Sequence, residues 1–194
     1  MVKLIIKRIL FLGGLIATFP LILITWIEEF ILGDRSAWVF SSCKEILSLC
    51  PTFLGDFMRL AYYWAVCTKV SINACFLFGC MLARRNTTVR SGAIIGAYSI
   101  IGYADIGENV LLAPRVSLLS GKYQHGRPEQ RVTNGEVVGE LQRISIGKNS
   151  WVGQDAVIMA NIGENCTVSA GSVVYKDVPD NTTVMGNPAR KVSL

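Results

Sequence analysis

Residues 144–174 read ISIGKNSWVGQDAVIMANIGENCTVSAGSVV, and an aliphatic residue recurs in them at steps of six. The recurring positions are Ile146, Val152 and Ile158 and, after a shortened step, Ile162, Val168 and Val174. A period of six matches neither the helix period of 3.6 nor the two-residue alternation of an ordinary strand. It predicts a short strand and a corner in each hexad, with the aliphatic side chain directed to the axis of a coil.

The same pattern extends upstream, where an aliphatic or aromatic residue precedes a small or turn-forming one. The upstream positions are Ile72, Phe78, Ile95, Ile101, Ile106, Leu112 and Leu118. Three hexads, about eighteen residues, would make a triangular coil, and a single coil cannot bury its apolar side. We therefore expect about four to five stacked coils over residues 70–178, with shortened corners at 101–106 and 158–162.

Before residue 70 the chain is mainly apolar, and it accounts for much of the 51% hydrophobic content. The uncharged run Ile9 to Ile27 would be about 28 Å long as a helix, close to the thickness of a bilayer core. Gly13, Gly14 and Pro20 interrupt this run, and Glu28 and Glu29 close it. A full span would export the rest of the chain, so a kinked re-entrant or interfacial helix is preferred to a span or to a cleaved signal peptide.

Residues 37–69 show helical spacing of apolar residues, and Pro51 divides the stretch into two helices. Asp56, Arg59 and Lys69 supply the polar positions. Two interpretations stay open: packing against the coils, or a monotopic membrane surface with Trp38, Tyr62, Tyr63 and Trp64 at headgroup level. The predicted division is residues 1–69 for membrane-associated helices and 70–194 for the solenoid.

Composition excludes several classes of function. The formal charge is +5, but the basic residues are scattered, so nucleic-acid binding is not expected. The six cysteines lack metal-like spacing, and one histidine cannot build a zinc site of several imidazoles, so no metal is expected. The sequence has no G-x-S-x-G, Walker or dinucleotide-binding motif.

One long interruption, residues 119–143, is polar and off-period, which predicts a loop outside the solenoid. It holds His125, whose imidazole is the leading candidate for a general base. A carboxylate normally orients such a histidine. The candidates for this role stay open and are Glu129, Glu136, Glu140 and, on a coil, Asp105.

The run WVGQDAVIMANIGENCTVSAGSVVYKDVPDNTTVMGNPARKV, with its segments SAGSVV, KDVP and GNPA, resembles the C-terminal coils of hexapeptide-repeat acyltransferases. The wider stretch 48–192 is similar to the membrane-associated O-acetyltransferases of bacterial surface-polysaccharide biosynthesis. This resemblance implies a left-handed parallel β-helix and a homotrimer with active sites between subunits. It also implies that His125, in SGKYQHG, deprotonates an acceptor hydroxyl for direct attack on the thioester of acetyl-CoA, without a covalent intermediate or a metal.

The resemblance assigns further residues by position. Gly153, Ala160, Ser169 and Ala170 would line the pantetheine channel, and Lys176 and Arg190 would meet the cofactor's phosphates. Solenoid corners need small residues in any case, and Ser169 and Asn73 stand where glycine is usual in the family. For sugar contacts we consider Tyr123, Arg127 and Glu129.

The sequence thus predicts an acetyl-CoA-dependent O-acetyltransferase acting on a hydroxyl of a sugar or a lipid-linked glycan. We expect it at the inner membrane, bound to lipids through its N-terminal helices, with the catalytic domain facing the cytosol. One alternative is a non-catalytic membrane-bound scaffold. Another is an acyltransferase that uses a longer acyl-CoA or an amine acceptor.

Overall fold

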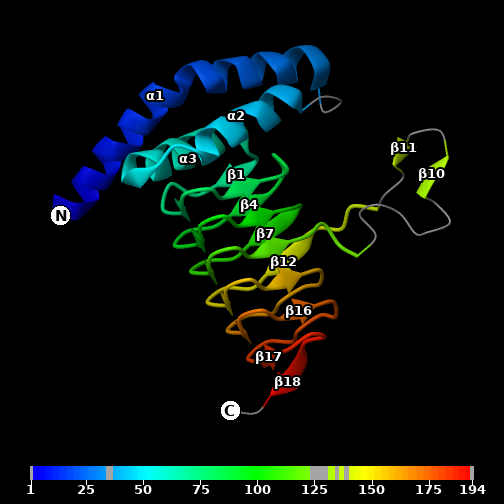
Figure 1. The fold of residues 1–194 in the computed structure, drawn as a ribbon. Helices are drawn as coiled ribbons and strands as arrows, with labels where there is room; N and C mark the ends of the chain where they lie inside the picture. The colour runs from blue at the N-terminus through cyan, green and yellow to red at the C-terminus, as the bar shows by residue number, and fades with distance from the viewer. Residues whose placement is uncertain (1, 34–36, 123–130, 134–135, 138–139, 193–194) are drawn as a thin grey trace.

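A computed structural model describes residues 2–33, 37–122, 131–133, 136–137 and 140–192. Three helices come first and a tapering stack of coils follows (Figure 1). The helices are α1 (Val2–Leu32), α2 (Trp38–Ser48) and α3 (Thr52–Val66). As the sequence predicted, α2 and α3 are separate helices on the two sides of Pro51, which cannot donate a helical hydrogen bond.

The coils form a parallel β-solenoid of about five turns with three faces, and the last turns continue face A through the isolated bridges of Ile162 and Val178. Face A holds β1 (Lys69–Val70), β4 (Thr88–Val89), β7 (Ala104–Ile106) and β12 (Ile144–Ile146). Face B holds β2 (Cys75–Phe76), β5 (Ile94–Ile95), β8 (Leu111–Leu112), β13 (Trp151–Val152), β15 (Thr167–Val168), β17 (Thr183–Met185) and the antiparallel β18 (Arg190–Val192). Face C holds β3 (Met81–Leu82), β6 (Ile100–Ile101), β9 (Ser117–Leu118), β14 (Val157–Ile158) and β16 (Val173–Val174). A separate antiparallel hairpin joins β10 (Arg131–Thr133) to β11 (Glu136–Val137).

The hexad residues form the core of the solenoid. Their side chains are at most 1% exposed at Phe76, Leu82, Val89, Ile95, Ile101, Ile106, Leu112, Leu118, Ile146, Val152, Ile158, Ile162, Val168 and Val174. Ile95 pairs with Leu112 and Val152 pairs with Val168, so these coils are one or two residues shorter than three full hexads. The prediction of stacked hexads with shortened corners is confirmed, but its register in the first coil is wrong: Phe76 and Leu82 are buried there, whereas the predicted positions Ile72 and Phe78 are only half-buried.

A ladder of asparagines stacks along the corner between faces A and B. Asn109, Asn149, Asn165 and Asn181 all have positive φ, a conformation that asparagine tolerates better than most residues. Each side-chain amide donates to the next carbonyl oxygen along the ladder, at 3.3, 3.1 and 3.3 Å. Asparagine therefore takes the positive-φ position of this corner in these coils, and side-chain hydrogen bonds hold the coils together there.

Helices α2 and α3 close the N-terminal end of the solenoid. Gly79 donates its N–H to the Ser48 carbonyl (3.0 Å), and Leu82 donates to the Tyr63 hydroxyl oxygen (3.2 Å). Arg59, one of the polar positions of the helical pattern, is fully buried. Its guanidinium donates to the carbonyls of Leu47, Cys50 and Phe76 at 2.8, 2.8 and 3.1 Å and pairs with Asp56. These acceptors replace water and allow the charge to be buried.

Helix α1 is continuous, so the expectation that Gly13, Gly14 and Pro20 interrupt it and that Glu28 closes it is wrong. Gly14 has a packing role: a Cβ there would lie 2.6 Å from the Phe57 carbonyl oxygen, so α1 can approach α3 closely only with glycine. Glu28 does not end the helix. Its carboxylate accepts the N–H groups of Val39 and Phe40 and thereby caps α2.

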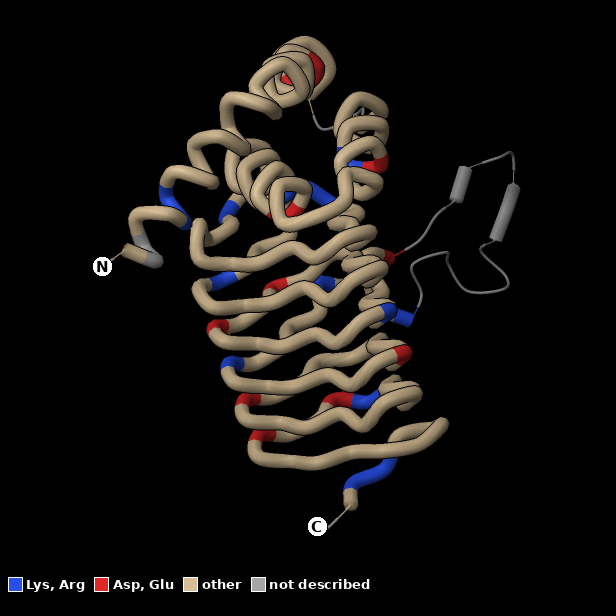
Figure 2. Tube along the Cα trace, turned by 60° about the vertical axis from the view of Figure 1, so that its left-hand side comes forward, with Lys and Arg blue, Asp and Glu red and all other residues tan. Residues whose placement is uncertain are grey.

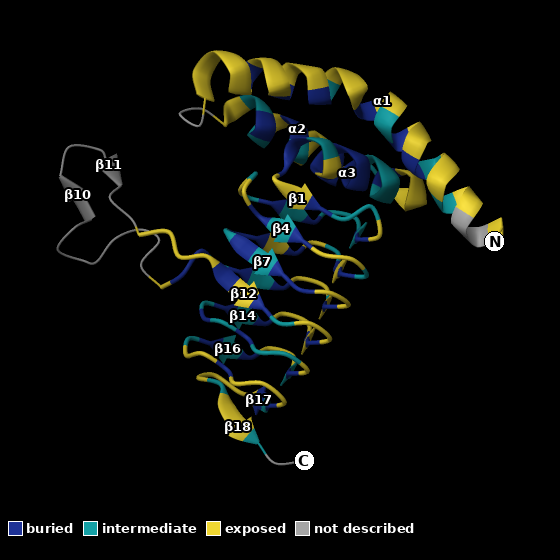
Figure 3. Cartoon of the chain, turned by 180° about the vertical axis from the view of Figure 1, so that it is seen from behind, coloured by how far each residue is buried: buried dark blue, intermediate teal, exposed yellow. Residues whose placement is uncertain are grey.

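The outward side of α1 is apolar and exposed, including Ile9, Ile16, Phe30 and Ile31, and Figure 3 shows this stripe along the helix. Among the described residues, α1 is the one helix long and apolar enough to cross a membrane by length and composition. Its inward side packs along α3, where Thr25 and Tyr62 share a hydrogen bond of 2.9 Å. The basic residues of α1 lie near its N-terminal end (Figure 2).

Candidate active site

The candidate site follows one edge of the solenoid, where face C turns into face A. We call this edge corner CA; among the described residues it consists of 83–87, 102–103, 119–122, 140–143, 159–161 and 175–177. The edge where face B turns into face C, corner BC, consists of residues 78–79, 97–98, 114–115, 154–155 and 170–171. The long loop and its β10–β11 hairpin leave the stack from corner CA (Figure 1).

Both ends of the loop are fixed to corner CA. Ser120 Oγ accepts the N–H of Tyr103 (2.9 Å), and the Ser120 carbonyl accepts the N–H of Gln142 (2.8 Å). At the far end of the loop, Arg143 donates to the Asn86 carbonyl (2.8 Å), and its guanidinium lies 5.0 Å from the centroid of the Tyr103 ring. The scaffold therefore defines where the loop begins and ends.

Four of the predicted site residues, Tyr123, His125, Arg127 and Glu129, lie outside the described residues. Glu140 is described and exposed, close to the returning end of the loop. Asp105 has both carboxylate oxygens engaged, by the Thr88 hydroxyl and by Arg90. Burial favours the neutral acid, but these two hydrogen bonds outweigh it and lower the pKa of Asp105.

A basic cavity of about 300 Å³ lies at the C-terminal end of corner CA. Lys176 and Arg190, both predicted from the sequence, line it together with Tyr175 and Lys191. The Tyr175 hydroxyl is hydrogen-bonded to Arg190, and this bond with the neighbouring lysines lowers the pKa of Tyr175. The structure thus brings the two predicted phosphate contacts into one cavity.

Sequence reasoning missed three members of this cluster: Lys122, Tyr175 and Lys191. Lys122 places its ammonium 5.5 Å from the centroid of the Tyr175 ring, and Lys176 lies 5.7 Å from the same centroid. Only their positions in the sequence could have indicated a role: Tyr175 directly precedes Lys176, and Lys122 lies at the start of the loop. The contact connects the loop that carries His125 to the basic cavity.

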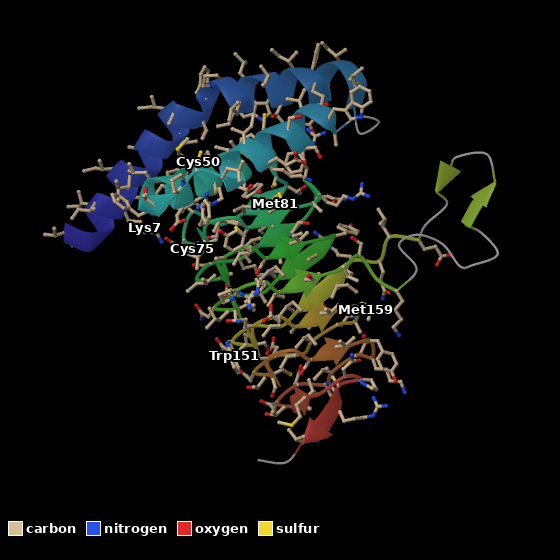
Figure 4. All side chains as sticks on the ribbon, in the orientation of Figure 1. Lys7, Cys50, Cys75, Met81, Trp151 and Met159 are labelled. Carbon is tan, nitrogen blue, oxygen red and sulfur yellow. The ribbon has the colours of Figure 1, made fainter. Side chains whose placement is uncertain are left out.

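The predicted small residues divide between the two edges of face C. Ala160 lies at corner CA and is buried, whereas Ala170 at corner BC is exposed, with Gly153 and Ser169 next to it. A Cβ on Gly153 would lie 2.4 Å from the Ala170 nitrogen, so coil stacking alone requires glycine there. These four small residues border the outward surface of β14 and β16, and Lys176 and Arg190 lie at one edge of that surface. Figure 4 places Met159 on the side of the loop and Trp151 on another side of the stack.

Comparison with known proteins agrees with this architecture. A family model, the hexapeptide repeat of succinyl-transferase, matches residues 143–176. The chain is a hexapeptide-repeat β-solenoid. A search of curated protein sequences gives no significant match.

Two solved structures share the solenoid. A maltose O-acetyltransferase from Clostridium difficile 630 is 23% identical with a TM-score of 0.56, over 79% of this chain and 83% of the other. A mutant of AntD, an N-acyltransferase from Bacillus cereus, is 20% identical with a TM-score of 0.51, over 62% of this chain and 69% of the other. The AntD structure is a complex with dTDP-4-amino-4,6-dideoxyglucose and coenzyme A. At these identities the likeness establishes the hexapeptide-repeat fold.

Proposed function

We propose that this solenoid is an acetyl-CoA-dependent O-acetyltransferase that acts on a hydroxyl of a sugar or a lipid-linked glycan. The observation that carries the proposal is the contact of Lys122 with Tyr175, which connects the His125 loop to the cavity of Lys176 and Arg190. A general base and an anion-binding cavity on one edge are what acyl transfer from coenzyme A needs. A non-catalytic scaffold has no need for this arrangement.

The cofactor lies across the outward side of face C in this proposal. Lys176 and Arg190 hold its phosphates in the basic cavity, because guanidinium and ammonium groups pair well with phosphate oxygens. The pantetheine arm then extends along β14 and β16 towards Ser169 and Ala170. This surface fits such an arm, since its outward residues Val157 and Val173 are small and half-buried.

The chemistry is one direct transfer. The neutral imidazole of His125 takes the hydroxyl proton as the hydroxyl oxygen attacks the thioester carbonyl. The tetrahedral intermediate then collapses, the C–S bond breaks, and the leaving thiolate takes the proton from the imidazolium. Glu140 is our choice to orient His125, because the alternative on the coils, Asp105, is already occupied by Thr88 and Arg90.

A homotrimer is part of the proposal. Ile94, Leu111 and Trp151 lie in register on face B, and their outward side chains remain 37%, 40% and 40% exposed. A column of apolar side chains on a rigid face is suited to burial against a second copy of the chain. Trimers would place active sites between subunits, as the family resemblance implies.

We also propose that α1 lies in the membrane interface on the cytosolic side of the inner membrane. Its inward side contacts α3 at Gly14 and Thr25, so its outward apolar stripe is the part free to enter lipid. Lys7 and Arg8 would meet anionic headgroups near its N-terminal end.

The test is transfer of labelled acetyl from acetyl-CoA to sugars and membrane-extracted glycolipids by the purified full chain. Label in a product that mild alkali releases identifies an ester and supports O-acetylation. Label in a product that is stable to alkali identifies an amide and would show that the acceptor is an amine. No transfer and no coenzyme A binding would favour the scaffold.

A further inference from the structure

A second cavity, of about 600 Å³, lies where the helices meet the first coil. Its walls come from the end of α1, the start of α2, the end of α3 and the first turn of corner CA. Glu29, Phe40, Arg84 and Arg85 are among the residues that line it. The transfer mechanism described above uses none of them.

The cavity is lined by two arginines, Arg84 and Arg85, and by one carboxylate, Glu29, so its lining carries a net positive charge. Arg85 is only 12% exposed, and its Nη1 lies 3.1 Å from Glu29 Oε2. That nitrogen is buried, and it makes no hydrogen bond within the described part of the chain. Arg84 is exposed and has no ion pair within the described ranges.

An apolar groove adjoins the same helix ends. Its volume is about 390 Å³, and its walls include Ile24, Ile27, Ile31, Leu32 and Trp38. The groove and the basic cavity have no lining residue in common, but both are bounded by the last turns of α1 and the first turns of α2, where Glu28 and Glu29 are neighbours in sequence. A ligand that fits both carries an anionic head on an apolar chain.

The cavity shares its edge of the solenoid with the catalytic loop. Arg84 and Arg85 stand on corner CA in the first coil, and Arg143 of the loop donates to Asn86 beside them. The loop begins two coils further along, at Ser120. Coils stack about 4.8 Å apart, so the loop root is only about 10 Å from the arginines along the edge.

We propose that this cavity binds the phosphate of a membrane-anchored, phosphate-linked glycan, with the lipid chain in the adjoining groove. Guanidinium groups of Arg84 and Arg85 bind the phosphate oxygens. The membrane-proximal sugars then lie beside the loop of His125. This inference rests on the proposed function, since it specifies the acceptor class of the same site.

The experiment measures binding of farnesyl diphosphate to the full chain by calorimetry, with inorganic diphosphate as the headgroup without a lipid. Arg84→Gln and Arg85→Gln should each weaken farnesyl diphosphate binding about tenfold or more, in line with the loss of a charge-assisted hydrogen bond. Arg84 is exposed, so its variant folds even if the Arg85 variant does not. Lys148→Gln, which removes a surface ion pair with Glu164 on the far corner, is the matched control and should bind as wild type.

A separate variant tests the apolar groove. Ile27→Asn should weaken farnesyl diphosphate binding and leave inorganic diphosphate binding unchanged. Unchanged binding in Arg84→Gln overturns the site. Equal affinity for inorganic and farnesyl diphosphate overturns the assignment to a lipid.

The assay needs neither acetyl-CoA nor His125, so the two proposals can fail separately. The protein could bind farnesyl diphosphate with the predicted effects of the variants and yet transfer no acetyl group. That result would support the lipid-phosphate site and contradict the proposed acetyltransferase activity. Acetyl transfer without such binding does the reverse.

Discussion

Lys122 and Tyr175 are far apart in sequence, yet the lysine ammonium lies 5.5 Å from the centroid of the tyrosine ring. Tyr175 is also hydrogen-bonded to Arg190. The start of the loop that carries the proposed base is thereby held against the proposed phosphate cavity.

Tyr175 should report on the cavity. Arg190 lowers the pKa of the phenol, so Arg190→Gln should return that pKa towards the ordinary value of about 10. Coenzyme A should also raise it, because bound phosphates oppose the tyrosinate and draw Arg190 away. The measurement is tyrosinate absorbance against pH, as the difference between wild type and Tyr175→Phe.

The sign of this shift limits its effect on stability. At neutral pH the phenol is protonated in folded and unfolded chains, so the lowered pKa adds no stability there. The extra stability arises as pH rises past the folded pKa, and it is lost again as pH falls through it. A coenzyme A-dependent decrease in the Tyr175 pKa would contradict the placement of phosphates here.

Arg59→Leu should lower the free energy of unfolding by about 3–5 kcal/mol, the cost of breaking a buried ion pair. The substitution leaves Asp56 and the carbonyls of Leu47 and Cys50 without their donor. Arg90→Gln breaks the exposed pair with Asp105 and should cost less than about 1 kcal/mol. Urea unfolding of both variants tests this, and equal costs would show that Arg59 does not hold the helical cap.

The two adjacent glycines of α1 offer a matched pair. Gly14→Leu should destabilise the chain by about 1–3 kcal/mol, because its Cβ meets the Phe57 carbonyl and α1 must move away from α3. A Cβ at Gly13 meets nothing within 4 Å, and leucine favours helix by about 0.8 kcal/mol over glycine. Unfolding midpoints and hydrogen exchange in α3 should separate the variants; similar behaviour would argue against α1 docking on α3.

The buried thiols should be inert. Burial raises the pKa of Cys80 to about 12 and also raises that of Cys67. A thiol-reactive dye at mildly alkaline pH should therefore label half-buried Cys50 before Cys67 and Cys80, and all six cysteines after unfolding in urea. Rapid labelling of Cys80 in the folded protein would show that the first coil opens.

Features that repeat locally could be predicted from the sequence, and features that depend on distant residues could not. Ile95, Ile101 and Val152 each signal burial through a six-residue period, so the solenoid and its shortened corners were predictable. The burial of Arg59 could not be predicted, because its acceptors, including the Phe76 carbonyl, come from other elements. Pro20 suggested a break, yet packing of α1 along α3 maintains the helix.

The site was predictable to a similar degree. Lys176 and Arg190 were assigned by resemblance, and the structure brings them into one cavity. Lys122 and Tyr175 carry no recognisable motif, and only the coiling of the chain brings them together. The role of His125 stays a prediction.

The central claim is most directly tested by the rate of acetyl-CoA consumption with an accepted glycolipid, for wild type beside His125→Asn. We expect the kcat of the variant to fall by about 100-fold or more, the typical contribution of a general base, while calorimetry shows unchanged affinity for coenzyme A. Wild-type turnover by the variant, with coenzyme A bound normally, would contradict the account.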